Sequence, residues 1–203
     1  MKLLALASLA LLVPLGLRSS SVEPAAAPAP SSAPASYLVD GVHSSTVFRV
    51  QHITTPFWGR FDKLEGALTF DAAAPESSKI EISIDAASVD TNDAKRDEHL
   101  RGADFFSAKE FPKMTFKSTR VAKKAEGKFE VTGDFTFHGV TKSIAVPVEY
   151  FGEEESPMQD RRAGFEATFE IKRSEYGVAE YIPVIGDSVR IIVALECIRQ
   201  KAK

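Results

Sequence analysis

Alternation of apolar and polar residues is the feature that most constrains this fold, and it recurs along nearly every extended segment after Tyr37. In Lys79–Asp85, for example, Ile80, Ile82 and Ile84 occupy one set of alternate positions and polar side chains the other. Successive side chains of a β-strand point to opposite faces of its sheet, so each segment should have one buried and one solvated face. This pattern is typical of antiparallel sheets.

About eight such segments follow a short first strand near Tyr37, and most of the connections between them are short. One of the eight, Gly59–Asp71, is interpreted as a single long run. Eight antiparallel strands with one inner face predict a closed barrel or a sandwich. An eight-stranded barrel is just wide enough to be filled by its own side chains or to hold one small ligand. The pattern therefore predicts an all-β fold, either an eight-stranded antiparallel barrel or a sandwich.

One segment, Thr91–Pro112, breaks the alternation and predicts a helical insert against the barrel. A short oxygen-bearing side chain among residues 91–93 can cap its start, and Gly102 can end it. Asp97 and Arg101 are four residues apart, so we expect them to pair on the helix surface. The charged side chains of the insert should then face water.

The first 36 residues are predicted to lie outside the fold. A short positive start precedes the apolar run Leu3–Leu17, which has the length of a secretory signal and is short for a membrane span. The following stretch, rich in Pro, Ala and Ser, cannot bury enough apolar surface to become ordered. We interpret residues 1–20 as a signal peptide, 21–36 as a linker and 37–200 as the folded domain. This predicts a periplasmic or secreted protein, with retention of the apolar run as an anchor as the alternative.

Composition excludes several classes of partner and cross-link. A formal net charge of −3 over 203 residues provides no electrostatic basis for binding nucleic acid. The one cysteine, Cys197, cannot form an intramolecular disulfide, so the fold must depend on its core. Because Cys197 falls in an alternating apolar run, we expect a buried and unreactive thiol.

Histidine placement suggests no catalytic or metal site. The four histidines show none of the spacings typical of metal ligands, and no nucleophile, redox or phosphate-binding motif occurs. His52 is in phase with Phe48 and Val50, so we expect it to face the interior and be hydrogen-bonded there. His99 is expected to be solvated on the helix, and His138 to be structural beside a turn. We predict no catalytic residue, metal or cofactor; an enzyme acting on a lipid-like substrate through His52 or His99 is the weaker alternative.

Phenylalanine dominates the predicted inner face: the chain has 14 Phe against one Trp and four Tyr. Phenylalanine has no polar group and suits a dry interior. These rings either fill a solid core or line a long apolar cavity for a lipid-like ligand, and periodicity alone does not distinguish the two. The candidate ligand-binding residues are Phe48, Val50, His52, Leu64, Leu68, Phe70, Ile82, Ile84, Leu100, Phe105, Phe106, Met114, Phe116, Phe135, Phe137, Phe165 and Phe169.

Motifs spread from about Tyr37 to Ile198 resemble those of the YceI-like family. The most specific block has the pattern D-x-x-R-D-x-H-L over residues 93–100, ahead of a Phe-Phe pair and a Phe-Pro pair. A second is H-G-V-T-K over residues 138–142. The segment Ile53–Trp58 departs from the family pattern by its Pro and Trp. The resemblance therefore does not predict the shape of one end of the cavity.

The resemblance implies a lipocalin-like, extended antiparallel barrel with a helix against it, in exported bacterial proteins that are often homodimers. It implies an elongated apolar cavity that binds a polyisoprenoid or similar long-chain lipid, with isoprenoid-quinone-like molecules or fatty-acid derivatives as ligands, and it carries over no catalytic motif. On this basis Leu100, Phe105 and Phe106 should face the barrel and make the insert an apolar lid. A solid-cored module for envelope stress or protein interaction is the alternative.

Overall fold

The computed structural model describes residues 34–201. The predicted signal peptide and most of the predicted linker lie outside the described residues. Strand β1 begins at Ala35, two residues before the predicted start of the domain at Tyr37. The elements in chain order are β1 (Ala35–Val39), β2 (Ser45–His52), β3 (Thr55–Phe61), β4 (Leu64–Phe70), η1 (Pro75–Ser77), β5 (Lys79–Asp85), η2 (Ala86–Ser88), β6 (Val89–Asp90), α1 (Ala94–Arg101), β7 (Lys113–Ala125), β8 (Lys128–Phe137), β9 (Val140–Glu155), β10 (Arg161–Lys172), η3 (Arg173–Tyr176) and β11 (Ile185–Arg199).

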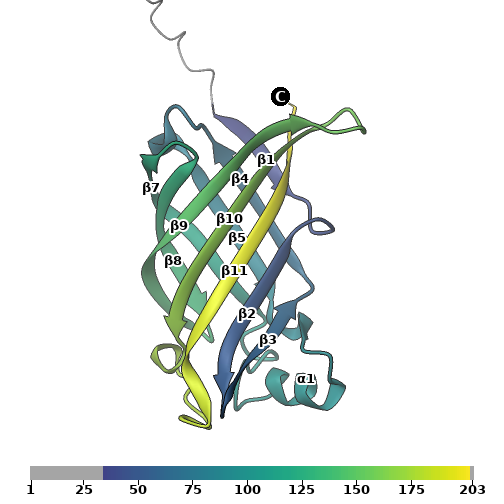
Figure 1. Ribbon diagram of the computed structural model, residues 1–203, viewed down its shortest axis with the longest axis vertical. Helices are drawn as coiled ribbons and strands as arrows, with labels where there is room; N and C mark the ends of the chain where they lie inside the picture. The colour runs from purple at the N-terminus through teal and green to yellow at the C-terminus, as the bar shows by residue number, and fades with distance from the viewer. Residues whose placement is uncertain (1–33, 202–203) are drawn as a thin grey trace, which may run out of the picture. The chain divides into compact units, whose positions relative to one another are not determined.

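Eight of these strands form a closed antiparallel barrel, as predicted (Figure 1). In order around the ring they are β1, β4, β5, β7, β8, β9, β10 and β11. The ring closes where β1 pairs with β11, with Leu38 opposite Ile198. Closure leaves each ring strand with one face inside and one outside, which explains the alternation in the sequence.

Three further strands extend the wall at one end of the ring. Strand β11 pairs with β1 only through residues 197–199, whereas its earlier part, between Ile185 and Ala194, pairs with β2. Strand β3 then pairs with β2, and the short β6 pairs with β3. The prediction of Gly59–Asp71 as one strand is wrong, because the chain divides at Asp62 and Lys63. Strand β3 belongs to the extension, and β4 belongs to the ring.

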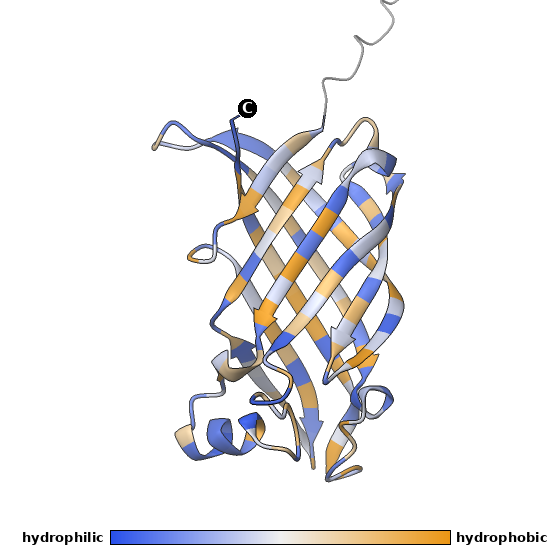
Figure 2. Ribbon diagram, turned by 180° about the vertical axis from the view of Figure 1, so that it is seen from behind, coloured by the Kyte–Doolittle hydropathy of each residue, from blue (hydrophilic) through white to orange (hydrophobic). Residues whose placement is uncertain are grey.

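Apolar and polar residues alternate along the barrel strands (Figure 2). On β8 every second residue from Phe129 to Phe137 is buried. Gly133 belongs to this inward set because the ring of Phe116, from β7, lies across it, and a Cβ at that position would overlap the ring. Glycine here lets an aromatic side chain from the neighbouring strand cover the backbone.

The two ends of the barrel differ in what surrounds them. We call the end beside α1 and the β10–β11 connection the helix end, and the end beside β1 and the last described residues the closed end (Figure 1). Each end has its own cluster of buried side chains. The closed-end cluster consists of Tyr37, Leu68, Phe70, Val121, Phe129, Val131, Ala163, Phe165 and Cys197. The helix-end cluster consists of Phe48, Phe61, Ile84, Ala86, Val89, Phe105, Ala108, Met114, Phe135, Phe137, Ile171, Tyr176 and Val178.

The cysteine of the closed-end cluster is buried, as predicted. Cys197 has no exposed surface, and burial raises the pKa of its thiol to about 12. A thiol that stays protonated in the neutral range is a poor nucleophile, because the thiolate is the reactive form. Cys197 therefore acts as a small packing residue at this end of the barrel.

Helix α1 is shorter than the predicted helical insert, and one of the carboxylates predicted to face water is buried. Asp93 caps its start by accepting a hydrogen bond from the backbone N–H of Arg96, and Gly102 ends it. The predicted surface pair of Asp97 and Arg101 is wrong. Asp97 is buried and accepts hydrogen bonds from the backbone N–H and the hydroxyl of Thr91, which holds the turn from β6 into the helix. Within residues 34–201, no helix is long and apolar enough to cross a membrane.

Candidate ligand-binding cavity

A cavity of about 460 Å³ lies inside the barrel and is lined almost entirely by apolar side chains. Ligand pockets typically have volumes of roughly 300–1,000 Å³. Leu68, Val131 and Phe165 belong both to the cavity wall and to the closed-end cluster. They mark the place where the hollow interior gives way to a filled one.

All but two of the candidate ligand-binding residues line this cavity. Leu64, at the start of β4, packs instead against the helix-end cluster. Phe70 lies in the closed-end cluster, with ring centroids 5.3 Å from Phe129 and 5.1 Å from Phe165. Leu64 and Phe70 share the inward phase of β4, but neighbouring side chains fill the interior around each of them. The candidates on the wall are Phe48, Val50, His52, Leu68, Ile82, Ile84, Leu100, Phe105, Phe106, Met114, Phe116, Phe135, Phe137, Phe165 and Phe169.

Several lining residues were not among the candidates. Tyr181, Val184 and Ile185 come from the β10–β11 connection and the start of β11. This stretch has no periodicity in the sequence that could have assigned its side chains to the interior. Phe57, from β3, also lines the cavity, whereas the neighbouring Trp58 is exposed. The segment Ile53–Trp58, which departs from the family pattern, therefore contributes Phe57 and not Trp58 to the cavity wall.

The cavity has its mouth at the helix end, where exposed lining residues gather. His52, at the end of β2, is exposed, so the prediction that it is buried is wrong. The phase of His52 does point it toward the interior, but the strand ends at the rim of the barrel. Arg96 and His99 of α1 and Tyr181 of the β10–β11 connection are the other exposed polar residues at this mouth.

A set of side-chain contacts joins the α1 segment to the β10–β11 connection across the mouth. His99 and Tyr181 both contact Asp104 Oδ2, at 3.0 Å from His99 Nε2 and 3.2 Å from the Tyr181 hydroxyl, which donates. The rings of Tyr181 and Phe105 are stacked at 5.7 Å. The hydrogen bonds from His99 and Tyr181 lower the pKa of Asp104. We call His99, Asp104, Phe105 and Tyr181 the latch.

The latch changes the interpretation of His99. His99 is exposed, as the predicted solvated face requires, and it also packs edge-on to Phe105, with ring centroids 5.1 Å apart, and lines the cavity. Leu100, Phe105 and Phe106 also line the cavity, as the lid hypothesis requires. The α1 segment therefore contributes both apolar and polar groups to the mouth.

Arg96 is held in place by neutral groups. Its Nε donates to the Thr91 hydroxyl at 2.8 Å and its Nη2 to the Thr91 carbonyl at 2.6 Å. The guanidinium carbon lies 4.5 Å from the centroid of the Phe57 ring, a cation–π arrangement. The Thr91 hydroxyl that accepts from Arg96 in turn donates to the Asp97 carboxylate. Among the described residues, no carboxylate forms an ion pair with Arg96.

Arg173 is a buried cation on the cavity wall, only 5% exposed. Its guanidinium donates to the backbone carbonyls of Val178, Glu180, Ile185 and Gly186 at 2.9–3.0 Å. Burial lowers the pKa of Arg173. These bonds fix the β10–β11 connection and so position the part of the mouth that carries Tyr181.

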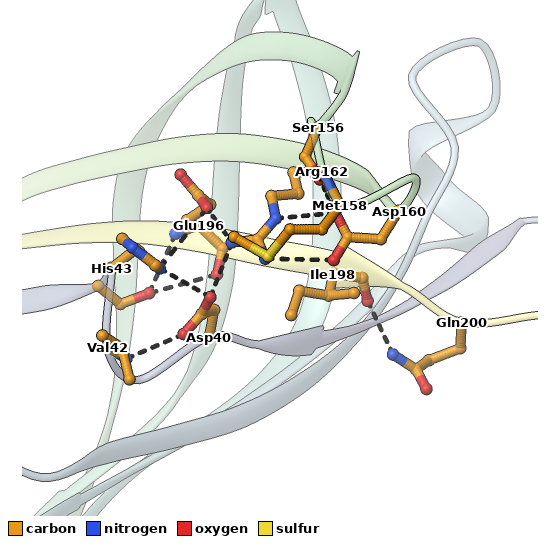
Figure 3. A network of polar contacts seen from close by, with 11 residues as sticks. Asp40, Val42, His43, Ser156, Met158, Asp160, Arg162, Glu196, Ile198 and Gln200 are labelled. Carbon is orange, nitrogen blue, oxygen red and sulfur yellow. Dashed lines mark hydrogen bonds and ion pairs between the residues drawn. The ribbon is translucent and has the colours of Figure 1, made fainter.

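A second polar cluster lies away from the cavity, on the outside of the barrel (Figure 3). The Asp40, His43 and Glu196 side chains approach closely enough to share a metal ion, with ligand atoms within 4.8 Å of one another. Arg162 already contacts both carboxylates, at 2.8 Å from Asp40 Oδ2. Hydrogen bonds from His43, the Val42 backbone and Arg162 lower the pKa of Asp40 to about 2. We assign this cluster a structural role, holding the β1–β2 turn against β10 and β11.

An antiparallel barrel with a filled closed end and an apolar cavity that opens beside a helix defines the class of lipocalin-like ligand-binding barrels. The YceI-like domain model matches residues 37–197, and the chain belongs to the YceI-like family. A UPF0312 protein of Ectopseudomonas mendocina is 37% identical over 169 residues, which cover 82% of this chain and 88% of the relative.

Solved structures share the fold. Burkholderia cenocepacia BcnA is 28% identical, with a TM-score of 0.72 over 78% of this chain and 98% of that chain. A polyisoprenoid binding domain from Saccharophagus degradans, implicated in plant cell wall breakdown, has a TM-score of 0.64 over 82% of this chain and 99% of that chain. At 19% identity, this second likeness concerns the fold alone.

Proposed function

We propose that this protein binds a long-chain lipid of the isoprenoid type, or a similar amphiphile, in its barrel cavity and carries or sequesters it without chemical change. The observation that supports this most is the apolar cavity of about 460 Å³, open at the helix end and lined by aromatic and aliphatic side chains. Burying an apolar chain there contributes roughly 0.8 kcal/mol per CH₂ group. The polyisoprenoid-binding domain with the same fold is consistent with such a ligand.

The two alternatives from the sequence find less support. A solid-cored module requires a filled interior, whereas a cavity of about 460 Å³ lies inside the barrel. An enzyme using His99 needs a nucleophile or a reacting group beside it. Among the described residues, no Ser, Thr or Cys side chain is hydrogen-bonded to His99 or His52, and His99 contacts Asp104 in the latch.

The proposed place of action is the periplasm or the outside of the cell. The apolar run Leu3–Leu17 after a positive start supports export. Fractionation of cells that express the full chain tests this: recovery in the cytosol at full length would contradict it. Homodimer formation also stays a prediction, and light scattering on the purified protein tests it.

Native mass spectrometry of the purified protein, with lipid extraction, tests lipid binding directly. We expect a co-purifying long-chain lipid or, after delipidation, binding of added polyprenyl or quinone analogues. The absence of any co-purifying lipid, together with a failure to bind the added analogues, would overturn the proposal.

A cavity-filling variant makes the test specific to the interior. Ala167 lines the cavity on β10, so Ala167→Trp should place an indole in the space that the lipid needs and lower lipid occupancy at least about tenfold. Ala145→Trp is the matched control, because Ala145 is exposed on β9. Equal lipid occupancy in the two variants would contradict binding inside the barrel.

A further inference from the structure

Two of the three fully charged side chains that line the cavity are positive, and the Asp104 carboxylate of the latch lies at the same mouth. The fully charged residues that line the cavity are Arg96, Arg173 and Glu166. Glu166 is exposed, alternates with the inward Phe165 and Ala167 on β10, and so belongs to the outer set of that strand. The two arginines are both tied to the helix end, one through α1 and the other through the β10–β11 connection.

Neither arginine has a carboxylate in direct contact. The guanidinium of Arg173 is balanced by four backbone carbonyls, and that of Arg96 by the Thr91 hydroxyl and carbonyl. Within residues 34–201, neither forms an ion pair. Arg173 is buried, and its guanidinium is already compensated by the backbone carbonyls. Arg96 is exposed at the mouth, so an anion that entered with the ligand would be within reach of its guanidinium.

The geometry of Arg96 suits a ligand contact. Its Nε and Nη2 donate to Thr91, and its guanidinium lies over the Phe57 ring. Among residues 34–201 no group accepts a hydrogen bond from Nη1, which can therefore donate to a ligand. Side chains three residues apart on a helix share a face, which brings His99 beside it at the same mouth. His52 lies at the same rim and adds a second ring nitrogen that can donate.

We propose that the ligand is an acidic amphiphile, with a carboxylate or phosphate head group bound by Arg96 at the mouth and its apolar chain inside the barrel. This rests on the proposed lipid-binding function and specifies its chemical class. Arg96 contacts the head group, whereas Arg173 stays clamped to the backbone and shapes the wall. Charge-assisted hydrogen bonds to guanidinium are stronger than those to neutral groups, so the head group should add measurable selectivity.

The test compares ligands with one chain and different head groups. Dodecyl phosphate, dodecanoate and dodecanol are titrated into delipidated protein by calorimetry. We expect at least one of the two acids to bind about tenfold or more tightly than the alcohol, and this ratio to shrink as salt is added. Comparing phosphate with carboxylate identifies the preferred acid. Equal affinity for acids and alcohol would overturn the acidic head group while leaving lipid binding intact; no binding of any of the three would instead count against the proposed function.

A pair of neighbouring charge deletions locates the head group. Arg96→Gln should remove the preference for acids over dodecanol, because the charged contact to the head group is lost, and the dodecanol affinity of the same variant is its internal reference. Lys95→Gln, one residue away on α1 and not on the cavity wall, should keep the preference. The ratio of acid to alcohol affinities is insensitive to a general loss of folded protein. A preference that survives in Arg96→Gln would overturn the assignment to Arg96.

Discussion

The closed end and the helix end of this barrel are built from the same kinds of residue and do different things. At the closed end, Phe70 contacts the rings of Phe129, Tyr150 and Phe165, with centroids 5.0–5.3 Å apart. Aromatic pairs at such distances contribute beyond the area they bury. At the helix end, aromatic side chains stand along a wall around a space that they do not fill.

The difference follows from what closes each end. Strand β1 closes the ring at the closed end, pairing with both β4 and β11, and small residues such as Ala163 let the rings meet in the middle. At the helix end the wall continues through β2, β3 and β6, and the opening is bordered by the α1 segment and the β10–β11 connection. Tertiary stability should therefore depend most on the closed end, and ligand retention on the helix end.

The largest predicted effect separates stability from binding. Phe70→Ala should lower the free energy of unfolding by about 3–5 kcal/mol, because it opens a void in a filled core. Phe169→Ala removes a half-buried ring that already borders the cavity, so we expect a loss of roughly 1–2 kcal/mol. Urea denaturation of the delipidated variants measures both.

Lipid binding by the same two variants should follow the opposite order. Folded Phe70→Ala protein should keep its lipid affinity, since Phe70 does not line the cavity, whereas Phe169→Ala should bind more weakly. If Phe169→Ala proved the more destabilising and Phe70→Ala the weaker binder, the division between the two ends would be wrong.

The sequence predicts the ring of the barrel well, because strand alternation is a local property. Closure around one interior requires every ring strand to keep its apolar phase, and runs such as Ile80, Ile82 and Ile84 show that phase without knowledge of partners. The same reasoning placed nearly all candidate residues on the cavity wall. It could not exclude Phe70, because filled and hollow parts of a barrel have the same periodicity.

Features of the mouth could not be predicted, because they depend on contacts between distant segments. Asp104 and Tyr181 are 77 residues apart and come from stretches without regular alternation. His52 follows the inward phase, yet lies where the strand ends and solvent begins. Asp97 has helical spacing to Arg101, but it is buried and accepts two hydrogen bonds from Thr91, which precedes the helix.

The next effect concerns the apolar part of the lid. Replacing Phe105 and Phe106 together by Ala should speed lipid loss several-fold or more, because both rings line the mouth. Phe111→Ala is the matched control: Phe111 lies in the same segment, but its ring packs on His138, with centroids 4.7 Å apart, outside the cavity. Transfer of a fluorescent lipid analogue to vesicles measures the rate.

The variant His99→Ala tests whether the polar contacts of the mouth or its phenyl rings contribute more to lipid retention. We expect His99→Ala to accelerate lipid loss less than the double Phe replacement does, since most of the free energy of lipid binding comes from apolar burial. A faster loss in His99→Ala would mean that the polar contacts of the mouth, and not the phenyl rings, control release.

The smallest predicted effect is the pH dependence of the latch. Its hydrogen bonds lower the pKa of Asp104 below the ordinary value of 3.8, so the latch favours the ionised carboxylate. That contribution is fully present above the ordinary pKa and is lost as the pH falls through the lowered value. Protonation of Asp104 should therefore accelerate lipid release modestly below about pH 4. Asp104→Asn should weaken the latch at neutral pH and remove this acceleration, as measured by vesicle transfer across pH. Acceleration that persists unchanged in Asp104→Asn would place the acid-sensitive group outside the latch.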